Sequence, residues 1–83
     1  MIEIFVFGHS KCQPCYYLKR QLDFKKIKYR YVDVEKENPN NWLVNSVPTV
    51  IILENGNIKE FLVGYSKKVL ETIEKYWREY GLL

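Results

Sequence analysis

The stretch IEIFVFGHSKCQPCYYL, residues 2–18, decides the fold of this chain. Residues 2–7 are apolar apart from one Glu, which is typical of a strand buried on both faces. Gly, His, Ser and Lys follow at residues 8–11 and predict a loop. A helix is expected to begin at or near Cys12, because Pro14 then falls in the first turn, where its missing N–H costs little.

The part of the chain that follows predicts a second strand and a short helix. Residues 28–34 form the strand, with alternate side chains pointing to opposite faces. An Asn-Pro pair at residues 38–39 is a helix start, since a capping side chain is followed by Pro at the first helical position. The Trp-Leu pair at residues 42–43 anchors this helix, which is expected to end by about residue 46.

A hairpin and a last helix complete the predicted elements. Residues 49–54 are an apolar strand, and Asn55-Gly56 is a strong hairpin signal because both positions tolerate positive φ. Residues 58–63 return antiparallel, and Ser66 is a good N-cap for the last helix. The apolar stripe of that helix is Val69, Ile73, Tyr76 and Tyr80, with Leu70 and Trp77 beside it and Gly81 as its C-terminal stop.

The order of these elements predicts the architecture. A βαβ unit in the first half predicts a parallel strand pair with a right-handed crossover, to which the second half adds an antiparallel hairpin. We therefore expect an α/β fold in which a mixed four-stranded sheet carries helices on both faces, as one domain of residues 1–83. A chain of 83 residues has a thin core, and its 16% aromatic residues supply much of the packing.

Composition and charge exclude several classes of protein. With 47% hydrophobic and 28% charged residues, the chain is neither disordered nor of low complexity. The basic side chains between residues 19 and 30 are interpreted as a solvated helix face and its exit loop, because no nucleic-acid recognition motif accompanies them. No signal peptide and no transmembrane span are expected. The expected location is the cytoplasm, a reducing compartment in which a C-x-x-C motif is more often catalytic or metal-binding than structural.

The two cysteines, Cys12 and Cys15, lie at the junction of strand and helix, where open α/β sheets place their sites. The N-terminus of a helix stabilises a thiolate, so we expect Cys12 to be the nucleophile with a lowered pKa, aided by Lys11 or His9 if these point inward. Cys15 lies one turn deeper and is the natural resolving thiol. The predicted reaction is thiol–disulfide exchange, which needs no organic cofactor and no metal.

Other interpretations of the two cysteines stay open. They could be buried and inert, although their place at a helix start argues against it. His9, Cys12 and Cys15 could also hold a metal in a non-enzymatic binding module, but a structural zinc site needs four ligands, so a carboxylate or a second chain would have to complete it. A haem site is excluded because Tyr16, rather than His, follows the second cysteine.

The chain resembles the thioredoxin family over nearly its whole length. The Cys-Gln-Pro-Cys motif resembles the active site of that family, in which Pro directly precedes the second cysteine. DVEKENP at residues 33–39 resembles the segment after the family's second strand, and SVPT at residues 46–49 resembles its cis-proline loop. ENG at residues 54–56 resembles its hairpin turn, and VGYSK at residues 63–67 resembles the loop before its last helix.

The resemblance implies how a substrate is bound. Pro48 would be cis and would face the two sulfur atoms, and Val47 would offer its backbone to an extended substrate peptide. The implied docking surface around Cys12 consists of Gln13, Pro14, Val47 and Gly64.

The chain departs from the family pattern at several positions. Lys11 stands where thioredoxins usually have Trp, and Gln13 where they have Gly. The family's buried Asp, which assists proton transfer to the resolving cysteine, would fall at Val6. The first strand and helix of the family are missing, so the chain resembles a minimal thioredoxin of glutaredoxin size.

The resemblance also implies partners. We expect a monomer that reduces disulfide-containing target proteins, with ribonucleotide reductase as one candidate, that takes electrons from a thioredoxin reductase, and that binds neither nucleic acid nor membrane. The alternative is a glutaredoxin-type, glutathione-dependent reductase. Against it, residues 64–67 read Gly-Tyr-Ser-Lys and lack the second Gly and the acidic pair that glutathione-binding glutaredoxins carry there.

Overall fold

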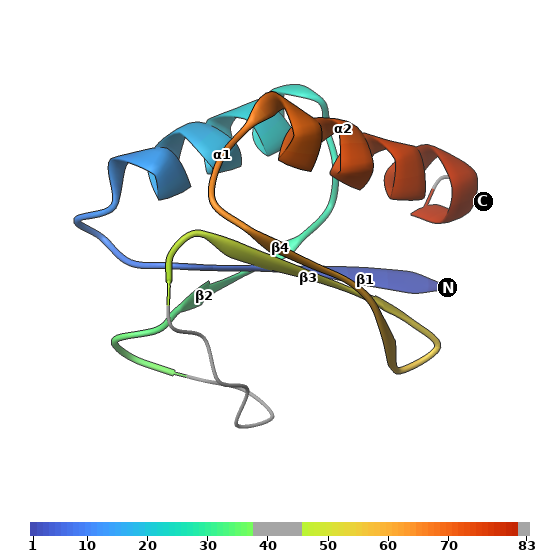
Figure 1. The fold of residues 1–83 in the computed structure, drawn as a ribbon, viewed down its shortest axis with the longest axis horizontal. Helices are drawn as coiled ribbons and strands as arrows, with labels where there is room; N and C mark the ends of the chain where they lie inside the picture. Colours follow the sequence, from blue (N-terminus) through green and yellow to red (C-terminus); the bar gives the residue numbers. More distant parts are fainter. Residues whose placement is uncertain (38–45, 82–83) are drawn as a thin grey trace.

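The computed structural model describes residues 1–37 and 46–81 of the chain. The described elements follow the chain in the order strand, helix, three strands, helix and π-helical turn (Figure 1). Their bounds are β1 Ile2–Gly8, α1 Gln13–Phe24, β2 Arg30–Asp33, β3 Thr49–Glu54, β4 Asn57–Val63, α2 Lys67–Tyr76 and the turn Trp77–Gly81. In these described stretches, no helix has the length and apolar character needed to cross a membrane.

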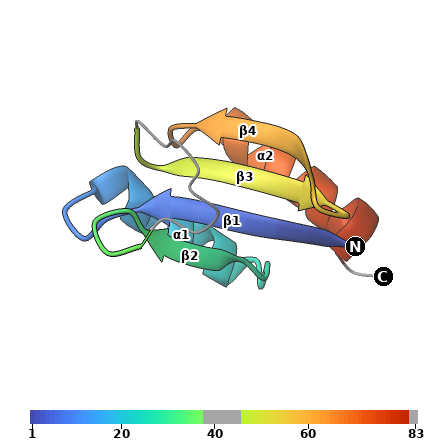
Figure 2. The ribbon, with the colours of Figure 1, turned by 90° about the horizontal axis from the view of Figure 1, so that it is seen from below.

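The four strands form one mixed sheet in the order β2-β1-β3-β4, which Figure 2 shows face-on. β1 pairs in parallel with β2, while β3 pairs antiparallel with both β1 and β4. The predicted parallel pair and hairpin are thus confirmed. Asn55 and Gly56 take φ values of 53° and 86°, the left-handed conformation that a two-residue hairpin turn requires.

Alternate side chains of the strands build a separate apolar cluster on each face of the sheet. On one face, Ile4 and Val6 of β1 pack with buried residues of the helices. Phe5 and Phe7 of β1 pack on the opposite face, with Val32, Ile51 and Leu53. The helix residues of the first cluster are Leu18, Leu22, Val69 and Ile73, so α1 and α2 cover the same face (Figure 1). The helix expected near residues 38–46, which was to complete the cover on both faces, lies almost entirely outside the described residues.

Both described helices begin as predicted. Cys12 is the N-cap of α1, and Pro14 is the second helical residue. Ser66 is the N-cap of α2, where its Oγ accepts a hydrogen bond from the Val69 N–H at 3.2 Å. The hydroxyl satisfies one of the unpaired amides in the first turn of α2.

The ends of two elements differ from the prediction. The second strand is shorter than residues 28–34, because pairing with β1 begins only at Arg30. Placing Tyr80 on the buried stripe of the last helix was wrong, since its side chain is 37% exposed and stacks on Tyr76. The reason is the π-helical turn that follows α2: its wider turn rotates later residues out of the stripe.

Candidate active site

The site is built at the point where β1 ends and α1 begins. Cys12 and Cys15 are joined by a disulfide, with an S–S distance of 2.11 Å and a Cα–Cα distance of 5.2 Å. The three-residue spacing brings the sulfur atoms together because one turn of helix separates the two positions. The structure thus places both cysteines of the motif in one disulfide at the start of α1.

The two sulfur atoms have different surroundings. The Cys12 residue is 9% exposed and lines a surface pocket, whereas Cys15 is only 1% exposed. The Cys15 N–H donates a hydrogen bond to Cys12 Sγ at 3.1 Å, within the first turn of α1. A thiolate on Cys12 is stabilised by this amide and by the positive end of the helix dipole. Because the Cys15 N–H donates to Cys12 Sγ, it does not donate to the sulfur of Cys15 itself.

The cis-proline loop lies beside this junction. The Val47–Pro48 peptide bond is cis, as the resemblance implied. Thr49 pairs with Phe7, so the adjacent Pro48 lies next to the last residue of β1, from which the cysteine loop starts. Pro48 O accepts a hydrogen bond from the Gly64 N–H at 2.8 Å, which brings Gly64 into the same loop cluster. Gly64 has φ of 89°, a conformation that favours glycine.

The remaining predicted site residues surround Cys12 in sequence. Lys11, Gln13 and Pro14 are all exposed. His9 holds the loop together, because its Nδ1 accepts a hydrogen bond from the Lys11 N–H at 3.2 Å and its backbone oxygen accepts one from the Cys12 N–H at 3.2 Å. Among the described residues, no group of three or more His, Cys, Asp and Glu side chains is arranged to hold a metal ion.

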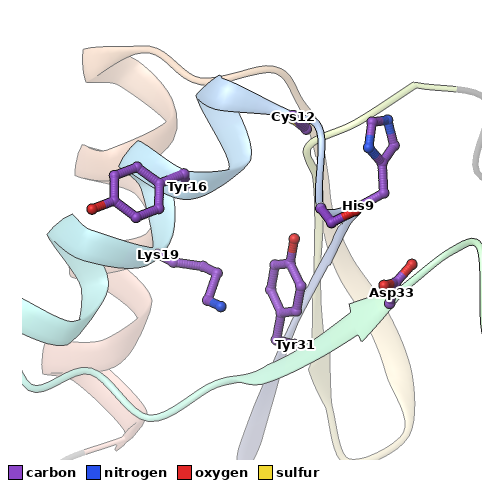
Figure 3. Close-up of a pocket in the computed structure, with 7 residues that line it drawn as sticks. His9, Cys12, Tyr16, Lys19, Tyr31 and Asp33 are labelled. Carbon is purple, nitrogen blue, oxygen red and sulfur yellow. The ribbon is translucent and has the colours of Figure 1, made fainter.

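The pocket beside Cys12 contains residues that the sequence analysis did not assign to the site. It has a volume of about 240 Å³ and lies between α1, β2 and the loop that joins β1 to α1 (Figure 3). Its lining residues are His9, Ser10, Cys12, Tyr16, Lys19, Tyr31 and Asp33. The signal that could have found Tyr31 was the alternation in residues 28–34, which places Tyr31 on the face that α1 covers.

Tyr31 lines this pocket and lies beside the first strand. It pairs in register with Val6, the position at which the family's buried Asp was expected, and Val6 is fully buried in the apolar core. The Lys19 ammonium lies 4.2 Å from the centre of the Tyr31 ring. Burial, and then the negative charge of Asp33, raise the pKa of Tyr31 above its ordinary value, so the hydroxyl stays protonated at neutral pH.

Comparisons with known proteins agree with this geometry. No protein-family model matches the sequence, and no curated protein matches it. Solved thioredoxin structures do match. Thioredoxin 1 of Thermosipho africanus is 28% identical, with a TM-score of 0.73 over 95% of this chain and 98% of that one.

Two further thioredoxins match with similar coverage. Thioredoxin of Plasmodium falciparum is 30% identical, with a TM-score of 0.61 over 90% of this chain and 81% of that one. The reduced thioredoxin pre-protein of Schistosoma mansoni is 26% identical, with a TM-score of 0.74 over 90% of this chain and 78% of that one. With its cysteine pair at disulfide distance, the chain is a thiol–disulfide oxidoreductase that belongs to the thioredoxin family.

Proposed function

We propose that this protein reduces disulfide bonds in other proteins, with Cys12 as the attacking thiol and Cys15 as the resolving thiol. The asymmetry between the two sulfurs carries the proposal. Cys12 lines the pocket and accepts the amide hydrogen bond, whereas Cys15 is buried behind it. A target disulfide can therefore reach Cys12 first, and Cys15 is held one turn away, ready for the second attack.

The proposed cycle balances without a cofactor. The Cys12 thiolate attacks one sulfur of the target disulfide, forms a mixed disulfide and releases the other target sulfur as a thiolate, which takes a proton from solvent. Cys15 loses its proton and attacks Cys12 Sγ. The Cys12–target bond breaks, the Cys12–Cys15 bond forms, and the second target sulfur leaves as a thiolate that is protonated in turn. Two electrons pass to the target.

Substrate docking is proposed at the cis-proline loop and the start of α1. Among the described residues, none forms a hydrogen bond to the Val47 backbone, which suits the pairing of Val47 with an extended peptide. The other proposed docking residues are Lys11, Gln13, Pro14, Pro48 and Gly64. Their mixture of exposed side chains and backbone favours recognition of an extended segment around a disulfide rather than of a small molecule.

A thioredoxin reductase is the proposed electron source. Glutathione would need a carboxylate to receive its ammonium group near the start of α2, but the first turn of α2 has no acidic residue and begins with Lys67 and Lys68. The Ser66 hydroxyl at this position already caps the helix. The proposed setting is a monomer in the cytoplasm that acts on protein targets, of which ribonucleotide reductase is one candidate, and that binds neither nucleic acid nor membrane.

The test is the reduction of insulin disulfides, with dithiothreitol as the electron source. The wild-type protein is expected to accelerate the reduction many-fold over dithiothreitol alone. Cys12→Ser removes the attacking group and Cys15→Ser removes the resolving group, so neither variant should turn over. Unaltered turnover by either folded variant would contradict the proposed roles.

A further inference from the structure

The resolving step requires a thiolate on Cys15, but the buried surroundings of this side chain disfavour a negative charge. Cys15 is 1% exposed, and burial in apolar surroundings raises the pKa of a thiol. Its own amide is committed to Cys12 Sγ. Val6, the position at which the resemblance expects the proton-transferring Asp, has only an apolar side chain. The Cys15 thiolate therefore needs a hydrogen-bond donor from another part of the structure.

Gly8 shows which hydroxyl shares the surroundings of the Cys15 sulfur. A Cβ atom added at Gly8 would collide with the Tyr31 hydroxyl and would lie 2.9 Å from Cys15 Sγ. The hydroxyl and the sulfur thus flank the same point at the end of β1. Both atoms border the space that a side chain at residue 8 would occupy.

The Tyr31 hydroxyl is also available to donate. Within the described part of the chain it forms no hydrogen bond in this oxidised form, whereas the hydroxyls of Tyr29 and Tyr76 donate to carboxylates at 2.7 and 3.0 Å. Its raised pKa keeps it protonated. The hydroxyl points toward the loop that carries Cys12 (Figure 3), and Tyr31 lines the pocket beside that cysteine.

We propose that the Tyr31 hydroxyl donates a hydrogen bond to the Cys15 thiolate and so makes the resolving step possible at neutral pH. This inference rests on the proposed function, in which Cys15 attacks the mixed disulfide. The Cys15 proton leaves to water in the pocket, and the hydroxyl keeps its own proton while it stabilises the sulfur anion. As in the proposed cycle, the Cys12–Cys15 bond forms, the Cys12–target bond breaks, and the target sulfur leaves with the electron pair.

Several charged or titratable groups surround this pair and belong to its pH dependence. Lys19 of α1 lies over the Tyr31 ring, and Asp33 of β2 contributes negative charge. His9 and Cys12 line the same pocket. Tyr29, just before β2, is close enough to interact electrostatically with Tyr31. None of them changes in the test variant, so a difference in its pH profile reports the hydroxyl alone.

The experiment follows the resolving step by itself. Reduced protein is mixed in a stopped-flow instrument with excess of an aromatic disulfide whose released thiolate is coloured. The first release of thiolate depends on reagent concentration and reports attack by Cys12. The second release is independent of that concentration and reports attack by Cys15 on the mixed disulfide. Its rate is measured against pH for wild type and for Tyr31→Phe.

A hydrogen bond to a charged group corresponds to a pKa change of about one unit or more. In Tyr31→Phe the midpoint of the second phase should therefore rise by about one pH unit. Because a more basic thiolate is also a better nucleophile, the variant should be about threefold slower well below the midpoint and about threefold faster well above it. The two profiles should cross, which a general loss of structure would not produce.

Tyr29→Phe is the matched control, because Tyr29 also packs at the edge of the same core cluster but donates its hydroxyl to Asp23, outside the pocket. Its profile should superimpose on that of wild type. An unshifted profile for Tyr31→Phe, or an equal shift for Tyr29→Phe, overturns the inference. If Tyr31→Phe does not fold, a fluorotyrosine at position 31, with a more acidic hydroxyl, should move the midpoint to lower pH, and no movement overturns the inference.

Controls separate this inference from the proposed function. If the second release of thiolate is absent in wild type, or persists in Cys15→Ser, Cys15 is not the resolving thiol. Both the proposed function and the role of Tyr31 are then contradicted. A second phase that requires Cys15 but has the same profile in Tyr31→Phe leaves the proposed function intact and removes only the role of Tyr31.

Discussion

The Tyr31 hydroxyl and the Cys15 side chain leave no room for a methyl group at Gly8, and this leads to a prediction about stability. The test is whether Gly8→Ala stabilises or destabilises the protein. Gly8 lies in β1, and its φ is outside the left-handed region, so alanine fits the backbone. A change from glycine to alanine at such a position stabilises a protein by about 0.4–1 kcal/mol, because the unfolded chain has fewer conformations. At Gly8 the added Cβ meets the Tyr31 hydroxyl, Cys15 Sγ at 2.9 Å and Cys15 Cβ at 3.0 Å. We therefore expect Gly8→Ala to destabilise the protein instead of stabilising it.

The magnitude follows from the rigidity of the neighbours. Cys15 is buried and bonded to Cys12, so it cannot move away from a new methyl group, and overpacking of this kind costs about 1–3 kcal/mol. After the gain from the unfolded chain is subtracted, the middle of the two ranges gives a loss of about 1.3 kcal/mol in the free energy of unfolding of Gly8→Ala. For a domain of this size, that lowers Tm by about 5–10 °C.

The assay is thermal unfolding of the oxidised protein, followed by circular dichroism. Gly8→Ala is compared with Tyr31→Phe and with the double variant, because removal of the hydroxyl relieves part of the collision and should give a coupling energy of about 0.5 kcal/mol or more. Gly56→Ala is the control: its Cβ meets no atom within 4 Å, so its cost comes from φ of 86° and should not couple to Tyr31→Phe. A Tm for Gly8→Ala at or above that of wild type would show that the added methyl group meets no collision.

Two further predictions concern alkaline stability and the electron source. Burial, and then the hydrogen bond to Asp23, raise the pKa of Tyr29, so its contribution to stability is complete below the ordinary tyrosine value of about 10 and is lost as pH rises toward the folded value. Denaturant unfolding above pH 10 should show a shallower loss of stability in Tyr29→Phe than in wild type, and parallel slopes would contradict this. In insulin reduction, NADPH with a thioredoxin reductase should support turnover, whereas glutathione with glutathione reductase should not. Equal turnover with glutathione would exclude the proposed electron source.

Much of the fold could be predicted because its signals are local. The apolar run of β1 followed by the Pro-containing start of α1, the Asn55-Gly56 turn and the Ser66 cap each depend on a few neighbouring residues. The cis bond before Pro48 has no such local signal and was expected only from the family resemblance. The end of α2 was missed because the change to a π-helical turn depends on how the last residues pack.

The pocket residues of the site could not be predicted for a different reason. Tyr31 and Cys15 both border Gly8 only because β1 and β2 pair with Val6 opposite Tyr31 and Gly8 opposite Asp33. One residue of slip in that register would turn Tyr31 to the opposite face of the sheet. The alternation within residues 28–34 predicted which face of the sheet carries Tyr31. It did not predict which residues of β1 lie opposite β2, so it could not show that Tyr31 lies near Gly8.

The most direct test of the central claim is to locate the mixed disulfide. Reduced Cys15→Ser and Cys12→Ser are each mixed with an oxidised protein substrate, and the trapped complexes are digested and mapped by mass spectrometry. We expect Cys15→Ser to accumulate a stable complex through Cys12 and Cys12→Ser to accumulate little, because the Cys15 sulfur is buried. Equal or greater trapping through Cys15 would contradict this expectation.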